Sequence, residues 1–227
     1  MNYLAIDTST MISTVTIADD KEILGDFNVN QLKTHSESLV PMIETLLDLL
    51  GMKVSDIDTF IIAHGPGSFT GLRIGMTIAK TLAQVENKDL LTISTLRAMA
   101  AGSTSNKFRA PMIDARSTRV YAGLFDENLN EIIKEDLYEI DDFARLVNEK
   151  DLDVELIGLL NDKYFDKFER AVKAPINLNT CIGGGLIRLA QTGDYKPRPL
   201  FEIGPNYLRK SQAEREFLKN DKRNDCK

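Results

Sequence analysis

The sequence is poor in the residues that build metal sites and disulfide frameworks. It contains two cysteines, two histidines and no tryptophan among 227 residues. Cys181 and Cys226 show no metal-ligand spacing and predict no disulfide framework, and His35 and His64 are far apart in the sequence. This composition suits a reducing compartment, so we expect a cytoplasmic protein without a metal centre of its own.

The sequence also lacks a membrane segment and a surplus of positive charge. The stretch Met1 to Asp7 has neither the charged start nor the long apolar run of a signal peptide, and no later apolar run approaches membrane-spanning length. We therefore expect no membrane partner. With 28 Lys plus Arg against 34 Asp plus Glu, the net charge is −6. This balance argues against a surface devoted to nucleic acid, so any RNA role would need a basic partner or a local patch.

Apolar runs and turn residues predict an α/β fold, and its first half resembles a ribonuclease-H-like lobe. There we predict strands at 3–6, 13–18, 21–29, 60–63 and 90–93, and helices at 35–50, 71–85 and 95–101. Three successive strands followed by alternating helices and strands are the element order of such a lobe.

A small polar stretch at 102–107 is the best candidate linker, and the pattern begins again after it. We predict strands at 109–114, 120–125, 131–139 and 154–159, and helices at 141–149, 164–172 and 182–191. The repetition predicts two lobes, at 1–103 and 104–200, of which the second is reduced. A C-terminal segment, 201–227, follows and is expected to be partly flexible at its charged end.

The most informative motif is the glycine-rich loop His64-Gly65-Pro66-Gly67-Ser68, between a predicted strand and a predicted helix. It matches neither a Walker loop nor a Gly-x-Gly-x-x-Gly run. Its glycines alone favour a tight strand-to-helix connection, but a helix N-terminus also exposes N–H groups that bind anions. The turn after the first strand is most simply an Asx or Ser/Thr turn, and it could face a phosphate or Mg²⁺. The candidate residues of an anion or nucleotide site are Asp7, Thr8, Ser9, Gly65, Gly67 and Ser68.

The predicted helices at 35–50 and 71–85 have apolar arcs that are wider than one sheet needs. Small residues recur every four positions in the second helix, which lets another helix come close. Either the two helices pack on each other and on their sheet, or the excess apolar surface forms a homodimer interface. The residues that we assign to that interface are Leu39, Met42, Ile43, Leu46, Leu72, Gly75, Met76, Ala79, Leu82 and Ala83.

These motifs resemble the bacterial TsaB (YeaZ) family nearly from end to end. The resemblance is carried by Ala5 to Ser9, His35 to Pro41, His64 to Gly75, Asp114 to Arg116 with Val120 and Tyr121, and Pro205 to Arg209. It implies a two-lobed fold of the actin, Hsp70 and sugar-kinase type. It also implies a non-catalytic dimerisation and scaffold role in threonylcarbamoylation of the adenosine 3′ of the anticodon, in tRNAs reading ANN codons.

The resemblance also implies partners and cofactors. The partners are a TsaD-type catalytic paralogue and a TsaE-type ATPase, with a homodimer when the chain is isolated and tRNA contacted only through the complex. No cofactor is expected on this chain alone, whereas the complex is expected to use ATP and a metal through its other subunits.

One difference from the catalytic paralogue concerns the metal. TsaD-type proteins carry a His-x-x-x-His pair just after the strand that corresponds to 90–93, and Thr95 and Met99 occupy these positions here. Neither side chain replaces an imidazole on a transition metal. The alternative function is a nucleotide-dependent small-molecule kinase or a metallopeptidase-like enzyme of the same fold. The roles of the two histidines stay open, and Arg73, just inside a helix N-terminus, predicts a carboxylate or phosphate partner.

Overall fold

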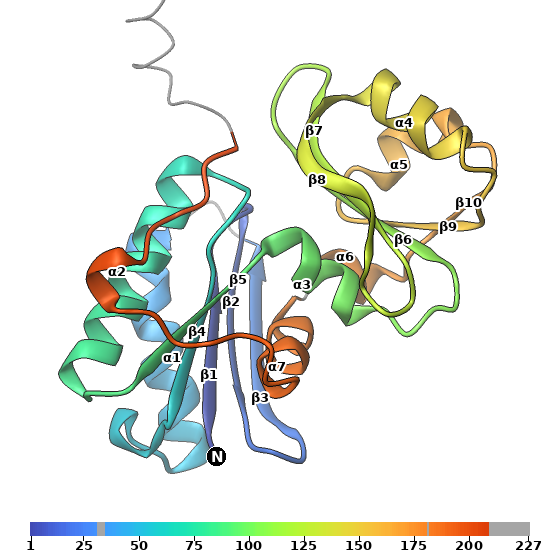
Figure 1. Ribbon diagram of the computed structural model, residues 1–227. Coiled ribbons are helices and arrows are strands. Elements are labelled where there is room, and N and C mark those ends of the chain that lie inside the picture. Colours follow the sequence, from blue (N-terminus) through green and yellow to red (C-terminus); the bar gives the residue numbers. More distant parts are fainter. Residues whose placement is uncertain (31–34, 181, 209–227) are drawn as a thin grey trace, which may run out of the picture.

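The computed structural model describes residues 1–30, 35–180 and 182–208. Cys181 and Cys226 lie outside these ranges, as does the charged end of the chain for which we predicted flexibility. The described chain forms two five-stranded sheets with helices packed against them (Figure 1). No helix among these residues is long and apolar enough to cross a membrane.

The first sheet has the strand order β3-β2-β1-β4-β5. Its strands are β1 (Tyr3–Asp7), β2 (Ile12–Ala18), β3 (Ile23–Asn30), β4 (Thr59–Ala63) and β5 (Asp89–Ile93). The pairs β1–β2 and β2–β3 are antiparallel, whereas β1–β4 and β4–β5 are parallel. The carboxyl ends of β1, β4 and β5 therefore meet at one edge of the sheet.

The second sheet repeats this arrangement, with the order β10-β9-β6-β7-β8. Its strands are β6 (Phe108–Asp114), β7 (Arg119–Phe125), β8 (Glu131–Glu139), β9 (Val154–Ile157) and β10 (Ala171–Lys173). In both sheets the first strand of the lobe is central, with two antiparallel strands on one side and two parallel strands on the other. This repetition confirms the predicted α/β fold of two ribonuclease-H-like lobes.

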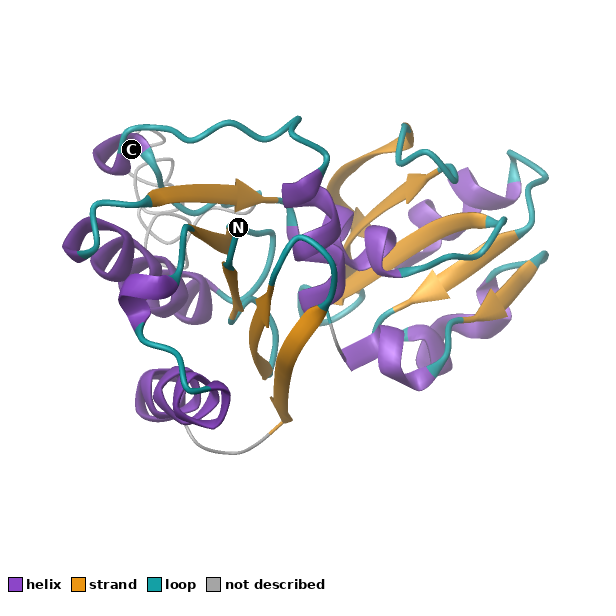
Figure 2. Ribbon diagram, turned by 90° about the horizontal axis from the view of Figure 1, so that it is seen from below, coloured by secondary structure: helices purple, strands orange, loops and turns teal. Residues whose placement is uncertain are grey.

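Helices cover both faces of the first sheet. α1 (His35–Leu50) and α2 (Phe69–Val85) cover one face, and α7 (Gly183–Gln191) covers the other face, with α3 (Thr95–Gly102) packed between α7 and the second sheet (Figures 1 and 2). Along β1, Leu4 and Ile6 face α1 and α2, whereas Tyr3 and Ala5 face α7. Because both faces are covered, β1 is apolar at nearly every position.

α7 comes from the predicted second lobe, 104–200, but packs on the first lobe. A Cβ atom on Gly183 would lie 1.8 Å from the Thr16 Oγ1 atom, and one on Gly185 would lie 1.9 Å from the Ala98 carbonyl oxygen. These glycines therefore allow α7 to lie directly against β2 and α3. Gly183 and Gly185 therefore have a packing role.

The second lobe departs from the prediction near its end. It contains α4 (Ile140–Asn148), α5 (Asn161–Tyr164), α6 (Ile176–Thr180) and the 3-10 turn η2 (Phe165–Lys167). Two further 3-10 turns lie outside this lobe, η1 (Val54–Asp56) and η3 (Leu200–Glu202). The predicted helix at 164–172 is wrong, because this stretch contains η2 and most of the edge strand β10. Such short elements have too few residues for periodicity to separate a helix from a turn and a strand.

Candidate functional site

The glycine-rich loop packs against the chain's own β1–β2 turn. A Cβ atom on Gly67 would lie 2.3 Å from the Ser9 carbonyl oxygen, and one on Gly71 would lie 2.0 Å from the Thr8 carbonyl oxygen. Gly75 is equally constrained, because its Cβ atom would lie 2.3 Å from the Thr8 Oγ1 atom. The glycines therefore allow α2 to approach the turn at backbone distance, which is the tight connection that the sequence favours.

The chain itself uses part of the hydrogen-bonding capacity of this loop. The Ser68 N–H donates to the Ser9 carbonyl at 2.6 Å, and the Ser68 hydroxyl accepts from the Gly71 N–H at 3.3 Å as the N-cap of α2. The Thr8 hydroxyl donates to the Gly71 carbonyl at 2.7 Å. These intramolecular contacts are enough to explain the geometry of the loop. Anion binding by the loop stays a prediction.

Asp7, at the end of β1, is a buried carboxylate with few stabilising partners. It is 2% exposed, and its Oδ1 atom accepts a hydrogen bond of 2.8 Å from the Ser9 N–H, which forms the expected Asx turn. Burial raises the pKa of Asp7 to about 6, although contacts with Ser9 and Thr8 partly oppose the shift. Asp7 is therefore largely ionised at neutral pH in a site that disfavours its charge.

Two polar side-chain atoms at the same edge of the sheet are buried without a partner among the described residues. They are the His64 Nδ1 and Thr95 Oγ1 atoms, which follow the carboxyl ends of the neighbouring strands β4 and β5. Burial also lowers the pKa of His64, so its ring is held neutral. Unpaired buried atoms of this kind need ordered water or a polar ligand.

Thr95 and Met99 are the residues that, by the resemblance, replace the metal-binding imidazoles expected in the paralogue. Thr95 is the first residue of α3, and its N–H donates to the Gly65 carbonyl at 2.9 Å. Met99 is buried in the apolar cluster between the lobes. Within the described part of the chain, no group of three or more His, Cys, Asp or Glu side chains could hold a metal ion.

His35 and Arg73, whose roles the sequence leaves open, make local contacts. His35 Nδ1 lies 2.7 Å from the Ser13 hydroxyl, and its Nε2 atom lies 2.9 Å from the Thr10 carbonyl, which ties the start of α1 to the β1–β2 turn. Arg73 has an aromatic environment instead of the predicted carboxylate or phosphate. Its Nε atom donates to the Tyr207 hydroxyl at 2.8 Å, and its guanidinium lies over the Phe69 ring.

Nine of the ten residues assigned to a homodimer interface are buried in the chain's own core. They are Leu39, Met42, Ile43, Leu46, Leu72, Gly75, Met76, Ala79 and Ala83, whereas Leu82 is partly exposed. These nine residues therefore pack within the chain's own core, and their predicted role in a homodimer interface stays a prediction. The physical reason for their burial is that α1 and α2 share one sheet and contact each other, so that each helix needs apolar side chains in two directions.

Exposed apolar side chains remain on this helix pair. Val40 and Leu49 on α1 and Val85 on α2 are 41%, 71% and 73% exposed. An association surface on these helices would use such residues. We define Val40, Leu49 and Val85 as the outer apolar residues, and homodimer formation through them stays a prediction.

The C-terminal segment 200–208 lies across α2 and the glycine-rich loop, where sequence reasoning did not place it. Ile203 is buried in the core beneath α1 and α2, and its carbonyl accepts from Lys80 Nζ at 2.9 Å. The Asn206 N–H donates to the His64 carbonyl at 2.7 Å. In Figure 1 this segment follows α2 along the first lobe. The Pro205 to Arg209 motif marks this segment in the sequence, but it does not indicate which surface of the protein the segment covers.

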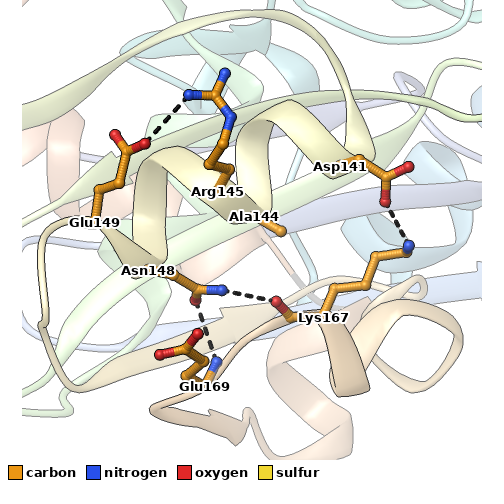
Figure 3. Close-up of a pocket in the computed structure, with 7 residues that line it drawn as sticks. All are labelled: Asp141, Ala144, Arg145, Asn148, Glu149, Lys167 and Glu169. Carbon is orange, nitrogen blue, oxygen red and sulfur yellow. Dashed lines mark hydrogen bonds and ion pairs between the residues drawn. The ribbon is translucent and has the colours of Figure 1, made fainter.

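A groove of about 540 Å³ lies on the second lobe, between α4 and the segment that follows η2 (Figure 3). Four of its charged side chains form ion pairs. Arg145 contacts Glu149 at 3.2 Å, and Lys167 pairs with Asp141. The Asn148 Nδ2 atom donates to the Lys167 carbonyl at 3.0 Å. These four charged side chains already have partners within the chain, which argues against a ligand site built on them.

Comparison with known proteins relates the chain to tRNA-modifying proteins. The TsaD family, tRNA N6-adenosine threonylcarbamoyltransferase, matches residues 22–201. The tRNA threonylcarbamoyladenosine biosynthesis protein TsaB of Bacillus subtilis (strain 168) is 27% identical over 238 residues, covering 98% of this chain and 100% of that protein. The chain belongs to the TsaB (YeaZ) branch of the TsaD family.

Further relatives support this membership. The Escherichia coli (strain K12) protein of the same name is 33% identical over 135 residues, which is 58% of each chain. The solved structure of YeaZ from Pseudomonas aeruginosa has a TM-score of 0.76 at 25% identity, covering 91% of this chain and 99% of that chain. The shared TsaB fold therefore includes both lobes.

Proposed function

We propose that this chain is the non-catalytic scaffold subunit of a cytoplasmic machinery for tRNA threonylcarbamoyladenosine biosynthesis. The observation that carries this proposal is the similarity over nearly the whole chain to a protein named as a TsaB of that pathway. The modified base is the adenosine 3′ of the anticodon in tRNAs reading ANN codons. A TsaD-type paralogue supplies the reacting groups, and this chain supplies a surface that stabilises and orients it.

The chemistry of this chain's own residues supports a scaffold role for this chain and a catalytic role for the paralogue. Thr95 and Met99 offer one hydroxyl and one thioether where the paralogue has imidazoles, and both are buried. The glycine-rich loop is packed against the turn at Thr8 and Ser9. These features hold the first lobe together, and α1 and α2 then present their outward face to a partner.

The proposal includes the assembly around this subunit. Its partners are the TsaD-type paralogue and a TsaE-type ATPase, and the isolated chain forms a homodimer through the α1 and α2 face. This chain holds no cofactor by itself, and ATP and the metal act on the other subunits. The tRNA is contacted through the complex, consistent with the net charge of −6 on this chain.

The enzyme alternatives have less support. A metallopeptidase needs a metal with its ligands, and a kinase needs phosphate loops from both lobes with an acidic metal ligand. Asp7 is the candidate for that ligand, but Gly183 and Gly185, the glycines of the second half, pack against β2 and α3.

Reconstitution tests the proposed function. The chain is added to the purified paralogue with the ATPase, tRNA, threonylcarbamoyl-adenylate and ATP, and modified adenosine is measured by mass spectrometry. We expect no modification by the chain alone and a sharp rise in the paralogue's activity when the chain is present. A variant with glutamate at Val85, an exposed position, tests the surface, and Ile132→Glu on the second lobe is its matched control.

A further inference from the structure

Arg73 is a cation that no carboxylate of the described chain neutralises. It is exposed near the start of α2, and none of the ion pairs among the described residues includes it. The whole chain has 34 acidic residues against 28 Lys plus Arg, so acidic groups are not scarce. An exposed arginine that has no acidic partner among the described residues can bind an acidic group of a partner molecule.

Two aromatic rings hold this arginine in place. The Arg73 Cζ atom lies 3.9 Å from the centroid of the Phe69 ring, and its Nε atom donates to the Tyr207 hydroxyl at 2.8 Å. The Phe69 and Tyr207 rings stack with their centroids 4.6 Å apart. We call Phe69, Arg73 and Tyr207 the arginine platform. Because the guanidinium is already oriented, less conformational freedom is lost when its terminal nitrogens bind a ligand.

The fold builds this platform from two distant parts of the chain. Tyr207 lies 134 positions after Arg73 and reaches α2 because two contacts just before it fix the C-terminal segment. Lys80 Nζ donates a hydrogen bond to the Ile203 carbonyl, and the Asn206 N–H donates to the His64 carbonyl. The platform is thus on the helix that carries Val85, one of the outer apolar residues.

The chemistry of the platform fits a carboxylate as its ligand. The Arg73 Nε atom is used by Tyr207, and the terminal nitrogens make no hydrogen bond to a described residue. Two parallel N–H groups match the two oxygens of a carboxylate, and arginine and tyrosine are among the residue types enriched in contacts that dominate binding energy.

We propose that Arg73 is a specificity-determining residue of the partner face and pairs there with a carboxylate of the TsaD-type paralogue. This inference rests on the proposed function, because it names the contact within the proposed interface. Tyr207 and Phe69 act as positioning residues for the guanidinium. The C-terminal segment therefore takes part in partner recognition.

The test measures the affinity of full-length variants for the purified paralogue by calorimetry at low and high salt. We expect Arg73→Ala to weaken binding about tenfold or more, and Arg73→Lys to weaken it less, because lysine keeps the charge but lacks the planar fork. Tyr207→Phe keeps the ring, removes the hydroxyl that holds Nε, and should weaken binding about threefold. Arg145→Ala, which removes an exposed arginine from the distant α4, should bind like the wild type.

Two results would overturn the proposal. Arg73→Ala could bind the paralogue with unchanged affinity and unchanged salt dependence while its thermal unfolding matches the wild type. Alternatively, Arg73→Ala could keep its affinity for the paralogue and lower the affinity of the assembled complex for tRNA, which would assign the platform to RNA phosphate. If the wild-type chain itself does not bind the paralogue, the proposed function fails, and this result is distinct from a failure of Arg73 alone.

Discussion

Replacing Asp7 with asparagine tests what the buried carboxylate at the end of β1 does to stability. Asparagine has nearly the same shape and keeps an oxygen that accepts from the Ser9 N–H. It removes the charge that burial disfavours. In the folded chain the pKa of Asp7 is about 6, against 3.8 for an unperturbed aspartate. One pKa unit corresponds to about 1.4 kcal/mol, so the ionised side chain destabilises the fold by about 3 kcal/mol.

The sign of the pH dependence follows from proton binding. Between pH 3.8 and about 6 the folded chain binds more protons at Asp7 than the unfolded chain does. The free energy of unfolding therefore falls as pH rises through this window and stays lower above it. The Asp7→Asn variant lacks this contribution, so it should match the wild type near pH 4 and exceed it at pH 8.

Urea unfolding of both proteins at pH values from 4 to 8 measures this difference directly. We expect the Asp7→Asn variant to be more stable by up to about 3 kcal/mol at pH 8, which corresponds to about 6 to 12 °C in Tm for a chain of this size. Asp48→Asn, at an exposed position of α1, is the control and should leave the pH profile unchanged. A gain that is the same at every pH, or a less stable variant at pH 8, would refute the reasoning.

Three further predictions follow from the packing and the side-chain chemistry. Gly71→Ala should lower the free energy of unfolding by about 1 to 3 kcal/mol in chemical unfolding, because the new Cβ atom would lie 2.0 Å from a carbonyl oxygen. Gly204→Ala is the control and should be nearly neutral in the same assay, because no atom lies near the new Cβ atom. Ala79→Glu should unfold the chain because Ala79 is fully buried. Val85→Glu should instead keep the circular dichroism spectrum and dissociate the homodimer in analytical ultracentrifugation. Metal analysis of the untagged chain should find no stoichiometric zinc or iron, and one tightly held equivalent would contradict our assignment of the metal to the paralogue.

Local patterns were enough to predict most of the fold. The predicted helix at 35–50 has the bounds of α1, His35–Leu50, because its apolar periodicity is long and Gly51 follows it. The two-lobe fold was also predictable, since the order of strands and helices repeats after the linker. The stretch 164–172 failed because a 3-10 turn and a three-residue edge strand are too short to show a period.

The site was less predictable, because its contacts join distant residues. The glycine pattern indicates that something approaches the loop, but the group that approaches is the turn at Thr8 and Ser9. Helix periodicity shows which face is apolar and not what covers it, so buried residues such as Ala79 were assigned to an interface. The Pro205 to Arg209 motif does not indicate that Tyr207 contacts Arg73, since only the folded chain brings the C-terminal segment to α2.

The central claim is that this chain acts on tRNA modification through a surface and not through a reacting group. The most direct measurement is the rate of threonylcarbamoylation of tRNA by the TsaD-type paralogue and the ATPase, with and without this chain. The account predicts a rate about tenfold or more higher with the wild-type chain, no modification by the chain alone, and little stimulation by the folded Val85→Glu variant. Modification by the chain alone, or a paralogue that works equally well without it, would contradict the account.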